Sequence, residues 1–388
     1  MNRKLISLAF VVFFYIFIVG AAYGDENAKL TLSEFAEKNN LTHKIISKSL
    51  EDPETLNKVL ETVIASDSKW RFLKDVNLKF KTFKATDGGD QALGFNYNFS
   101  KDINKRLFKE NSADQAGLSF SINLEGNVAF DKKTNPNDFL NSNLSLHVFR
   151  SQGGAITVTD DVKTMLNALE KKLADIENRD DLFKSPVFKT FADTMLKNMT
   201  NQFYIDFSFI GGLESNQSFT EKQYYYGGQL GFDAKAWNPD STLAQYNIFD
   251  WPFAAIRWLS GTDETFLPRG STIPTVLIGV DLVDPQSGVV KQVHSDKSTF
   301  TRLRSEASFR TPIVEIMKNN LAYFEADYRY YKEFNASGET KKEKLDKFEY
   351  FTSALILSNG IFVSYSTGKL PLDAKKDQVY ELGFKFNF

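Results

Sequence analysis

Apolar and polar residues alternate one for one through much of this chain, and the alternation is clearest in its last nine residues. Tyr380, Leu382, Phe384, Phe386 and Phe388 occupy every second position, with mostly polar residues between them. Successive side chains of a β-strand point to opposite faces, so this segment has one apolar face and one mostly polar face. The tail therefore predicts a strand whose outer face contacts an apolar medium.

These five residues, in the tail Tyr-Glu-Leu-Gly-Phe-Lys-Phe-Asn-Phe, resemble the C-terminal signature of Gram-negative outer-membrane β-barrels. The barrel-assembly machinery recognises that signature, so the resemblance implies that the five residues form an assembly signal. It also implies outer-membrane lipid around the protein, and periplasmic chaperones and the assembly machinery as partners. The resemblance covers the tail alone and assigns no specific family.

The same period of two recurs from Asp75 onward, for example in residues 76–80, 118–130 and 203–209. The total is about twelve strands, an even number as in single-chain outer-membrane barrels, with ten or fourteen left open. Soluble β-sandwiches alternate as well. Aromatic residues that recur at both ends of strands, such as Tyr224/Tyr226, are however typical of the girdles of a membrane barrel. We therefore expect an all-β fold, an antiparallel transmembrane β-barrel over 75–388.

The composition supports this fold class. The chain contains 36 Phe and 15 Tyr, yet its mean hydropathy is only -0.32, as expected where lipid-facing and lumen-facing residues alternate. Beyond the N-terminus, no stretch approaches the roughly 20 apolar residues of a membrane helix. The net charge of -2 and the lack of a basic patch argue against nucleic acid as a partner. With no Cys and no His pair at ligand spacing, we expect no metal site and no cofactor.

The first 24 residues predict a signal peptide, with a basic start, an apolar run over 5–20 and small residues over 21–24. An uncleaved anchor is the alternative. Export without cysteines fits a bacterial envelope better than a secreted eukaryotic protein. Residues 25–70 predict a periplasmic helical extension.

Two helical insertions are expected within the barrel, at about 160–199 and 242–260. The second contains Trp251, Phe253 and Trp258 and favours a helix at the membrane interface or the barrel rim over a plug. Strands counted backward from the tail place both insertions at the periplasmic end and the polar segment 332–347 outside.

The inward face predicted by the alternation is rich in charged residues of both signs. We expect the pore-lining set to be Lys79, Lys81, Asp206, Asp233, Asp281, Arg302, Arg304, Glu306, Glu325, Asp327 and Arg329. These residues form either a salt-bridge network that fills a narrow barrel or a constriction that selects solutes. The sequence leaves the two interpretations open, and the near balance of signs predicts no strong ion selectivity.

Few residues are candidates for catalysis, because the chain has only 3 His. His147 alternates with apolar neighbours and faces the predicted lumen near Ser145 and Ser151, which makes it the only candidate base. The His-x-Ser-Asn-type motif of the outer-membrane phospholipase family is not found. A lumen histidine within a hydrogen-bond network is therefore the favoured interpretation, and no catalytic residue is assigned.

The pattern as a whole favours a non-enzymatic, porin-like channel or transporter for small solutes in the bacterial outer membrane. One alternative is a lipid-modifying enzyme of the phospholipase or lipid A hydrolase type, and another is a structural or adhesive barrel. The solute and the oligomeric state are not indicated.

Overall fold

The computed structural model describes residues 76–85, 92–111, 114–129, 138–157, 159–173, 186–262, 273–287, 298–316, 321–358, 360–373 and 376–387. The predicted signal peptide (1–24) and helical extension (25–70) lie outside the described residues, as does Phe388 of the predicted assembly signal.

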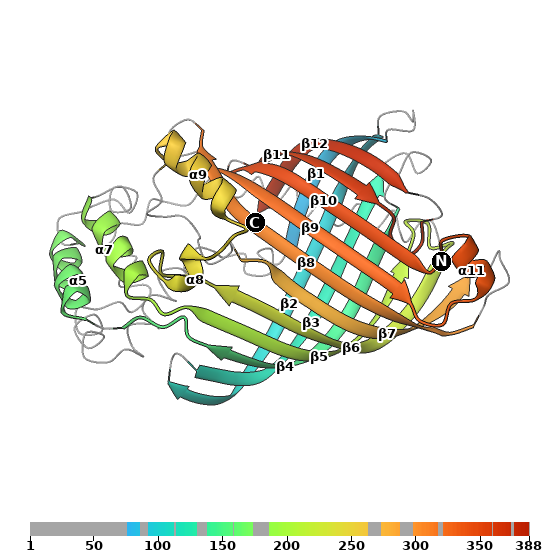
Figure 1. The fold of residues 1–388 in the computed structure, drawn as a ribbon, viewed down its shortest axis with the longest axis horizontal. Coiled ribbons are helices and arrows are strands. Elements are labelled where there is room, and N and C mark those ends of the chain that lie inside the picture. Colours follow the sequence, from blue (N-terminus) through green and yellow to red (C-terminus); the bar gives the residue numbers. More distant parts are fainter. Residues whose placement is uncertain are drawn as a thin grey trace, which may run out of the picture.

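Twelve strands form one antiparallel sheet that closes on itself, because each strand pairs with its neighbours in sequence and β1 pairs with β12 (Figure 1). This confirms the predicted fold class and strand number. The strands are β1 (Val76–Ala85), β2 (Ala92–Asn111), β3 (Asp114–Ala129), β4 (Leu140–Gln152), β5 (Gln202–Ser215), β6 (Lys222–Lys235), β7 (Thr275–Ser287), β8 (Phe300–Glu315), β9 (Leu321–Glu333), β10 (Lys347–Leu357), β11 (Ile361–Gly368) and β12 (Asp377–Asn387).

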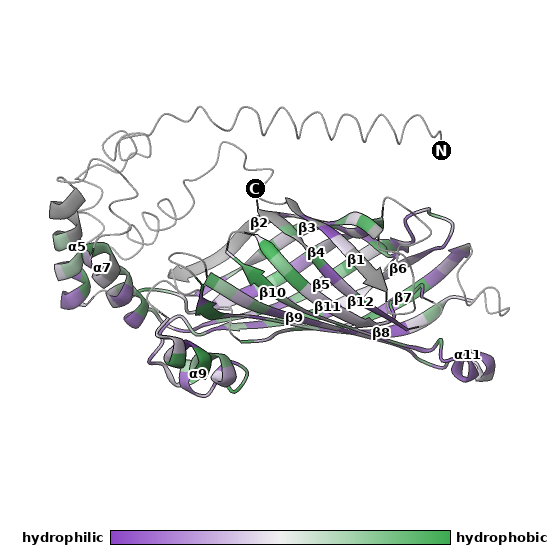
Figure 2. Cartoon of the chain, turned by 90° about the horizontal axis from the view of Figure 1, so that it is seen from above, coloured by the Kyte–Doolittle hydropathy of each residue, from purple (hydrophilic) through white to green (hydrophobic). Residues whose placement is uncertain are grey.

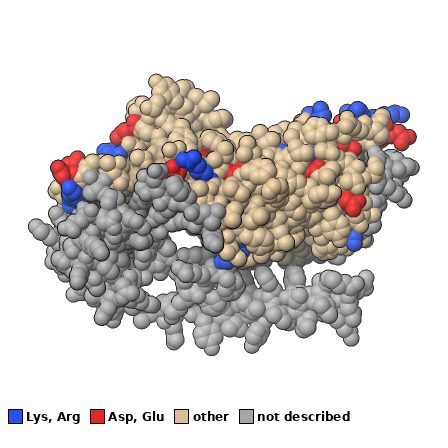
Figure 3. All heavy atoms as spheres, turned by 90° about the horizontal axis from the view of Figure 1, so that it is seen from below, with Lys and Arg blue, Asp and Glu red and all other residues tan. Residues whose placement is uncertain are grey.

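The outer wall of the barrel is apolar, and the polar residues turn inward. On β5, Phe207 and Phe209 are exposed whereas Asp206 and Ser208, which alternate with them, are buried. The same alternation is visible along other strands in Figure 2. The part of the wall visible in Figure 3 carries few charged side chains, and many of those shown gather toward its ends. A closed barrel with this polarity has no unpaired sheet edge and presents apolar side chains to its surroundings.

The two ends of the barrel differ. We call the end where β1 begins and β12 finishes the terminal end, and the other the distal end. Links that follow even-numbered strands lie at the terminal end, so both long insertions are there, α5 (Asp160–Leu173) with α7 (Pro186–Lys197) and α8 (Thr242–Gln245) with α9 (Trp251–Ser260) (Figure 1). The short helix α11 (Gly338–Lys342) lies at the distal end. None of the described helices is long and apolar enough to cross a membrane.

The first insertion has a small core of its own. Ile156, Val162, Phe191 and Met195 are buried together, and Ile156 forms a β-bridge with Met199. The apolar faces of α5 and α7 thus pack against each other rather than against the barrel.

Helix α9 lies against the outer face of the barrel rather than inside it (Figure 2). Phe253 stacks on Phe324 of β9 with ring centroids 5.0 Å apart. Arg257 forms an ion pair with Asp250 at 2.6 Å and donates to the carbonyl oxygen of Pro312 on β8 at 2.6 Å. These contacts fix α9 at the rim while Trp258 remains 79% exposed.

Two details differ from the sequence reading. β2 extends to Asn111, well beyond the apolar alternation that ends near Phe99, because its charged half still pairs with β3. A glycine pair within a strand, such as Gly211 and Gly212, is typical of a bulge or bend, but β5 pairs regularly through both residues. Gly212 instead leaves room for a neighbouring ring, since a Cβ there would lie 2.7 Å from the Tyr225 side chain.

Candidate functional site

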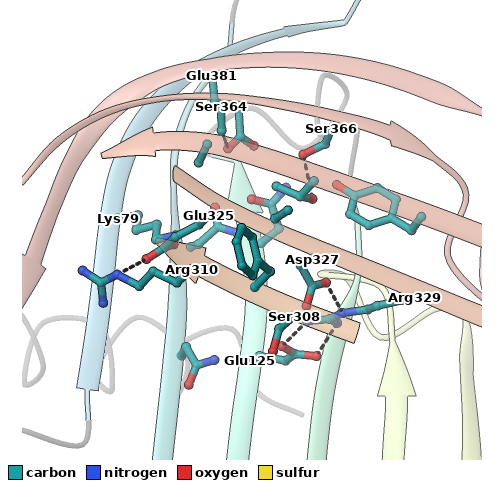
Figure 4. Close-up of a pocket in the computed structure, with 18 of the residues that line it drawn as sticks. Lys79, Glu125, Ser308, Arg310, Glu325, Asp327, Arg329, Ser364, Ser366 and Glu381 are labelled. Atoms are coloured by element: carbon teal, nitrogen blue, oxygen red, sulfur yellow. Dashed lines mark hydrogen bonds and ion pairs between the residues drawn. The ribbon is translucent and has the colours of Figure 1, made fainter. Parts of the chain in front are cut away.

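Two cavities lie inside the described part of the barrel, and both are lined mostly by polar and charged residues. The larger, cavity A, has a volume of about 590 Å³ and is lined by residues of ten strands (Figure 4). It reaches from Lys235 and Thr275, at the terminal end, to Leu370 in the link between β11 and β12 at the distal end. The smaller, cavity B, has a volume of about 300 Å³ and lies against β4 and its neighbours. Water and small polar solutes therefore have space inside the barrel.

An ion pair crosses the lumen between the two cavities. Arg329 on β9 donates two hydrogen bonds to Glu125 on β3, at 2.8 and 3.1 Å (Figure 4). These strands stand opposite each other in the ring, with five strands between them on either side. Asp327 holds the same guanidinium from its own strand at 3.1 Å. Arg329 and Glu125 line both cavities, so the bridge is part of the wall that separates them.

A second charge cluster fills the side of the lumen formed by β5 to β9. Arg302 donates to both oxygens of Glu214 at 2.8 and 2.9 Å and to Asp281 at 3.0 Å. The rings of Tyr225 and Tyr331 lie 5.5 and 4.9 Å from its guanidinium carbon. Arg302, Glu214 and Asp281 are each at most 2% exposed. Such charges are tolerated in a dry interior only because each is paired.

The link between β11 and β12 packs into the distal mouth of the barrel, and we call residues 369–373 the plug. Leu370 and Leu372 are buried against Phe139 and Tyr331, with Tyr350 packed beside them. Tyr350 also lines cavity A, so the plug packs on side chains that point into the barrel.

An acidic side chain lies at the base of the plug. The N–H of Leu370 donates to Asp373 Oδ2 at 2.7 Å. Burial raises the pKa of Asp373 to about 7, and the nearby carboxylates of Asp377, Asp138 and Glu221 act in the same direction. Lys369, whose pKa is lowered by burial, donates to the carbonyl oxygen of Lys344. The plug therefore contains a carboxyl that changes charge near neutral pH.

His147 lies in a chain of three hydrogen-bonded side chains at cavity B. Its Nε2 is 2.7 Å from Ser145 Oγ, and its Nδ1 is 3.0 Å from Asp206 Oδ2. Ser145 and His147 sit two residues apart on the inward face of β4, and Asp206 is on the adjacent strand β5. Ser151, which the sequence also placed near His147, is bonded instead by Gln202 at 2.9 Å.

The structure places the predicted pore-lining residues on the inward face, in four settings. Asp281, Arg302 and Arg304 are in or beside the buried charge cluster. Lys79, Asp233, Glu325, Asp327 and Arg329 line cavity A, whereas Arg304, Glu306 and Arg329 line cavity B. Lys81 pairs with Glu381 between β1 and β12, and Asp206 holds His147. Many of these charges thus serve ion pairs rather than an open channel wall.

Two residues central to the lumen were not in the predicted set. Glu125 lies on the polar face of the 118–130 run, so the alternation predicts that its side chain points inward. The alternation does not predict its partner, which lies on the opposite wall. Glu214 follows the glycine pair on β5, and glycines within a strand often mark a bend, but this strand continues to Ser215.

Comparisons with known proteins add little. No family model matches the sequence, and no curated protein matches it. Among solved structures, the chain is similar to the β-domain of the Bordetella autotransporter BrkA, at 8% identity and a TM-score of 0.26, covering 81% of this chain and 98% of that one. It is similar to the KdgM porin, at 8% identity and a TM-score of 0.24, covering 80% and 99%. It is also similar to an anion-selective porin from Comamonas acidovorans, at 9% identity and a TM-score of 0.26, covering 80% and 96%. Likenesses this weak carry no argument about the function of this chain.

Proposed function

We propose that this protein is a bacterial outer-membrane channel for small polar solutes, held closed at its distal mouth by the plug. One observation carries the proposal. Cavity A, a space of about 590 Å³ lined mostly by polar and charged residues, runs from the terminal end of the barrel to Leu370. This space gives a small polar solute a path through the barrel once the plug is displaced.

The outer wall supports a membrane location. Exposed apolar residues follow one another at every second position, as Leu144, Leu146 and Val148 do on β4. In water, exposure of many such side chains would favour aggregation, whereas lipid solvates them. Export by a cleaved signal peptide, escort by periplasmic chaperones and insertion by the barrel-assembly machinery belong to the same proposal.

The lumen supports passage of small solutes over large ones. The Arg329–Glu125 bridge spans the barrel from wall to wall, so a solute must pass beside it. Both signs of charge line the path in cavity A, with Lys79 and Arg310 near Glu325, and with Asp327 beside Arg329 (Figure 4). This arrangement favours polar or zwitterionic solutes and gives little preference for anions or cations.

Solute flux into proteoliposomes tests the proposal. We expect Leu370→Ser/Leu372→Ser to raise swelling in a small zwitterion such as glycine well above that of the wild type, with no swelling in a large dextran. Phe334→Ser is the matched control, because it removes an exposed apolar side chain at the same end and should change nothing. A plug variant that folds, shown by migration that depends on boiling, yet admits no glycine would overturn the proposal.

A further inference from the structure

The hydrogen-bonded chain at cavity B has the order of groups that nucleophilic catalysis needs. A carboxylate only accepts hydrogen bonds, so in the neutral form of the His147 imidazole the ring proton sits on Nδ1, which is 3.0 Å from Asp206 Oδ2. Nε2 is then an acceptor, and the Ser145 hydroxyl, 2.7 Å away, must be the donor. The serine proton is therefore already directed at a base that a carboxylate holds in the right tautomer.

Cavity B gives the serine a space in which a substrate could bind. Ser145 and His147 both line it, together with Asn143, Gln229 and Arg304. At about 300 Å³ it is at the lower limit of ordinary ligand pockets, which measure about 300–1,000 Å³. It therefore fits a small molecule and not a phospholipid with two acyl chains.

Two amide side chains on the wall of cavity B are candidate donors to a bound substrate. Arg304 donates to Gln229 at 2.8 Å, and since arginine only donates, the atom it contacts must be Oε1. Among the described residues, no hydrogen bond engages Gln229 Nε2 or Asn143 Nδ2. Amide N–H groups on the wall of the same cavity are the kind of donor that stabilises an oxyanion.

We propose that Ser145, His147 and Asp206 form a hydrolytic site inside the barrel, acting on small, water-soluble carboxylic esters. Ser145 Oγ bonds to the acyl carbon as its proton passes to His147 Nε2. The ester C–O bond breaks, and the alcohol leaves with that proton. Water then attacks the acyl-serine, again giving a proton to His147, which returns it to Ser145 Oγ as the carboxylic acid departs. Asp206 is a positioning residue throughout.

The orientation of Ser145 indicates from which side a substrate reaches it. Ser145 is buried on the inward face, whereas its neighbours Leu144 and Leu146 are exposed on the outer face. An ester in the surrounding bilayer would have to cross the wall, so the substrate enters through the lumen. This hydrolytic activity is additional to the proposed channel function, and it is tested by ester hydrolysis rather than by solute flux.

A glycine supplies a test of the Asp206 position that leaves every reacting group in place. A Cβ built on Gly231 of β6 would overlap Asp206 Oδ1, because the carboxylate lies directly over the glycine. Gly231→Ala is therefore expected to displace Asp206 from His147 while Ser145 and His147 remain.

The experiment uses the refolded full barrel in detergent, with a fluorophosphonate probe and p-nitrophenyl acetate. We expect the probe to lose fluoride and to label Ser145, mapped by mass spectrometry, and Ser145→Ala and His147→Asn to lose labelling and hydrolysis. Asp206→Asn and Gly231→Ala should lower kcat by about 100-fold or more with KM little changed. Ser119→Ala is the control, because Ser119 is a buried serine directly opposite His147 on β3.

Each outcome decides the proposal. A folded wild-type barrel that neither takes up the probe at Ser145 nor hydrolyses the ester would overturn it, as would full activity in Ser145→Ala. Should a variant fail to fold, the mapped label on the wild type still gives the answer. Hydrolysis of phosphatidylcholine in micelles at the rate of the small ester would overturn the assigned substrate class. A failure here leaves the glycine flux of the plug variant unaffected, so the two proposals fail separately.

Discussion

Replacing Glu214 by Gln removes one charge from the buried cluster while keeping the shape of the side chain. In the wild type, Arg302 and Arg304 are balanced by Glu214 and Asp281. Breaking a buried ion pair on one side usually costs about 3–5 kcal/mol. Asp281 keeps its 3.0 Å bond to Arg302, and glutamine still offers an acceptor. We therefore expect the lower end of that range, a loss of about 3 kcal/mol in the free energy of unfolding.

The assay is equilibrium urea unfolding in lipid vesicles, followed by the fluorescence of the 4 Trp residues. Glu349→Gln is the matched control, because it makes the same chemical change in a partly exposed pair with Lys347 on β10. Such pairs contribute about 0–1 kcal/mol. If Glu214→Gln lies within about 0.5 kcal/mol of the wild type, or costs no more than Glu349→Gln, the buried cluster does not stabilise the barrel as argued.

Three further predictions concern the plug, the wall and the rim. Because the pKa of Asp373 is raised to about 7, stabilisation of the packed plug is complete below the ordinary aspartate pKa and is lost as pH rises through 7. Solute flux should therefore rise with pH in the wild type, whereas Asp373→Asn should stay low throughout; a flat wild-type profile would refute this. Gly212→Ala should destabilise the barrel by about 1–3 kcal/mol in the same urea assay, because its Cβ would crowd the Tyr225 ring. Trp258→Ala should leave refolding unchanged but reduce the quenching of tryptophan fluorescence by lipids brominated near the headgroup, since this exposed side chain on α9 is expected at the membrane interface.

Local alternation was enough to predict the barrel, because the period of two and the position of apolar residues are properties of each strand alone. Phe207 and Phe209 show this directly, as their outward direction follows from their spacing. The length of β2 was missed for the same reason. Its second half is held by pairing to β3 rather than by its own pattern, and Lys101 to Asn111 do not alternate as apolar and polar.

The contents of the lumen could be predicted only in part. Parity placed Arg302 and Arg329 inside, but their partners Glu214 and Glu125 lie on other strands, and closure of the sheet decides which strands meet. The plug could not be predicted either. Leu370 and Leu372 are two isolated apolar residues in a loop, and only the folded structure shows that they pack against Tyr331. The alternation alone places His147 near Ser145. That Asp206 lies beside them follows only from the register of β4 against β5.

Single-channel recording of the refolded barrel in planar bilayers is the most direct test of the proposed plugged channel. The wild type should be closed for most of the record. Leu370→Ser/Leu372→Ser should open steps of small conductance, and further replacement of Glu125 and Arg329 by serine should enlarge those steps, because the bridge crosses the remaining path. If the folded plug variant is as silent as the wild type, or if its conductance is unchanged when the bridge is removed, the lumen is not a solute path.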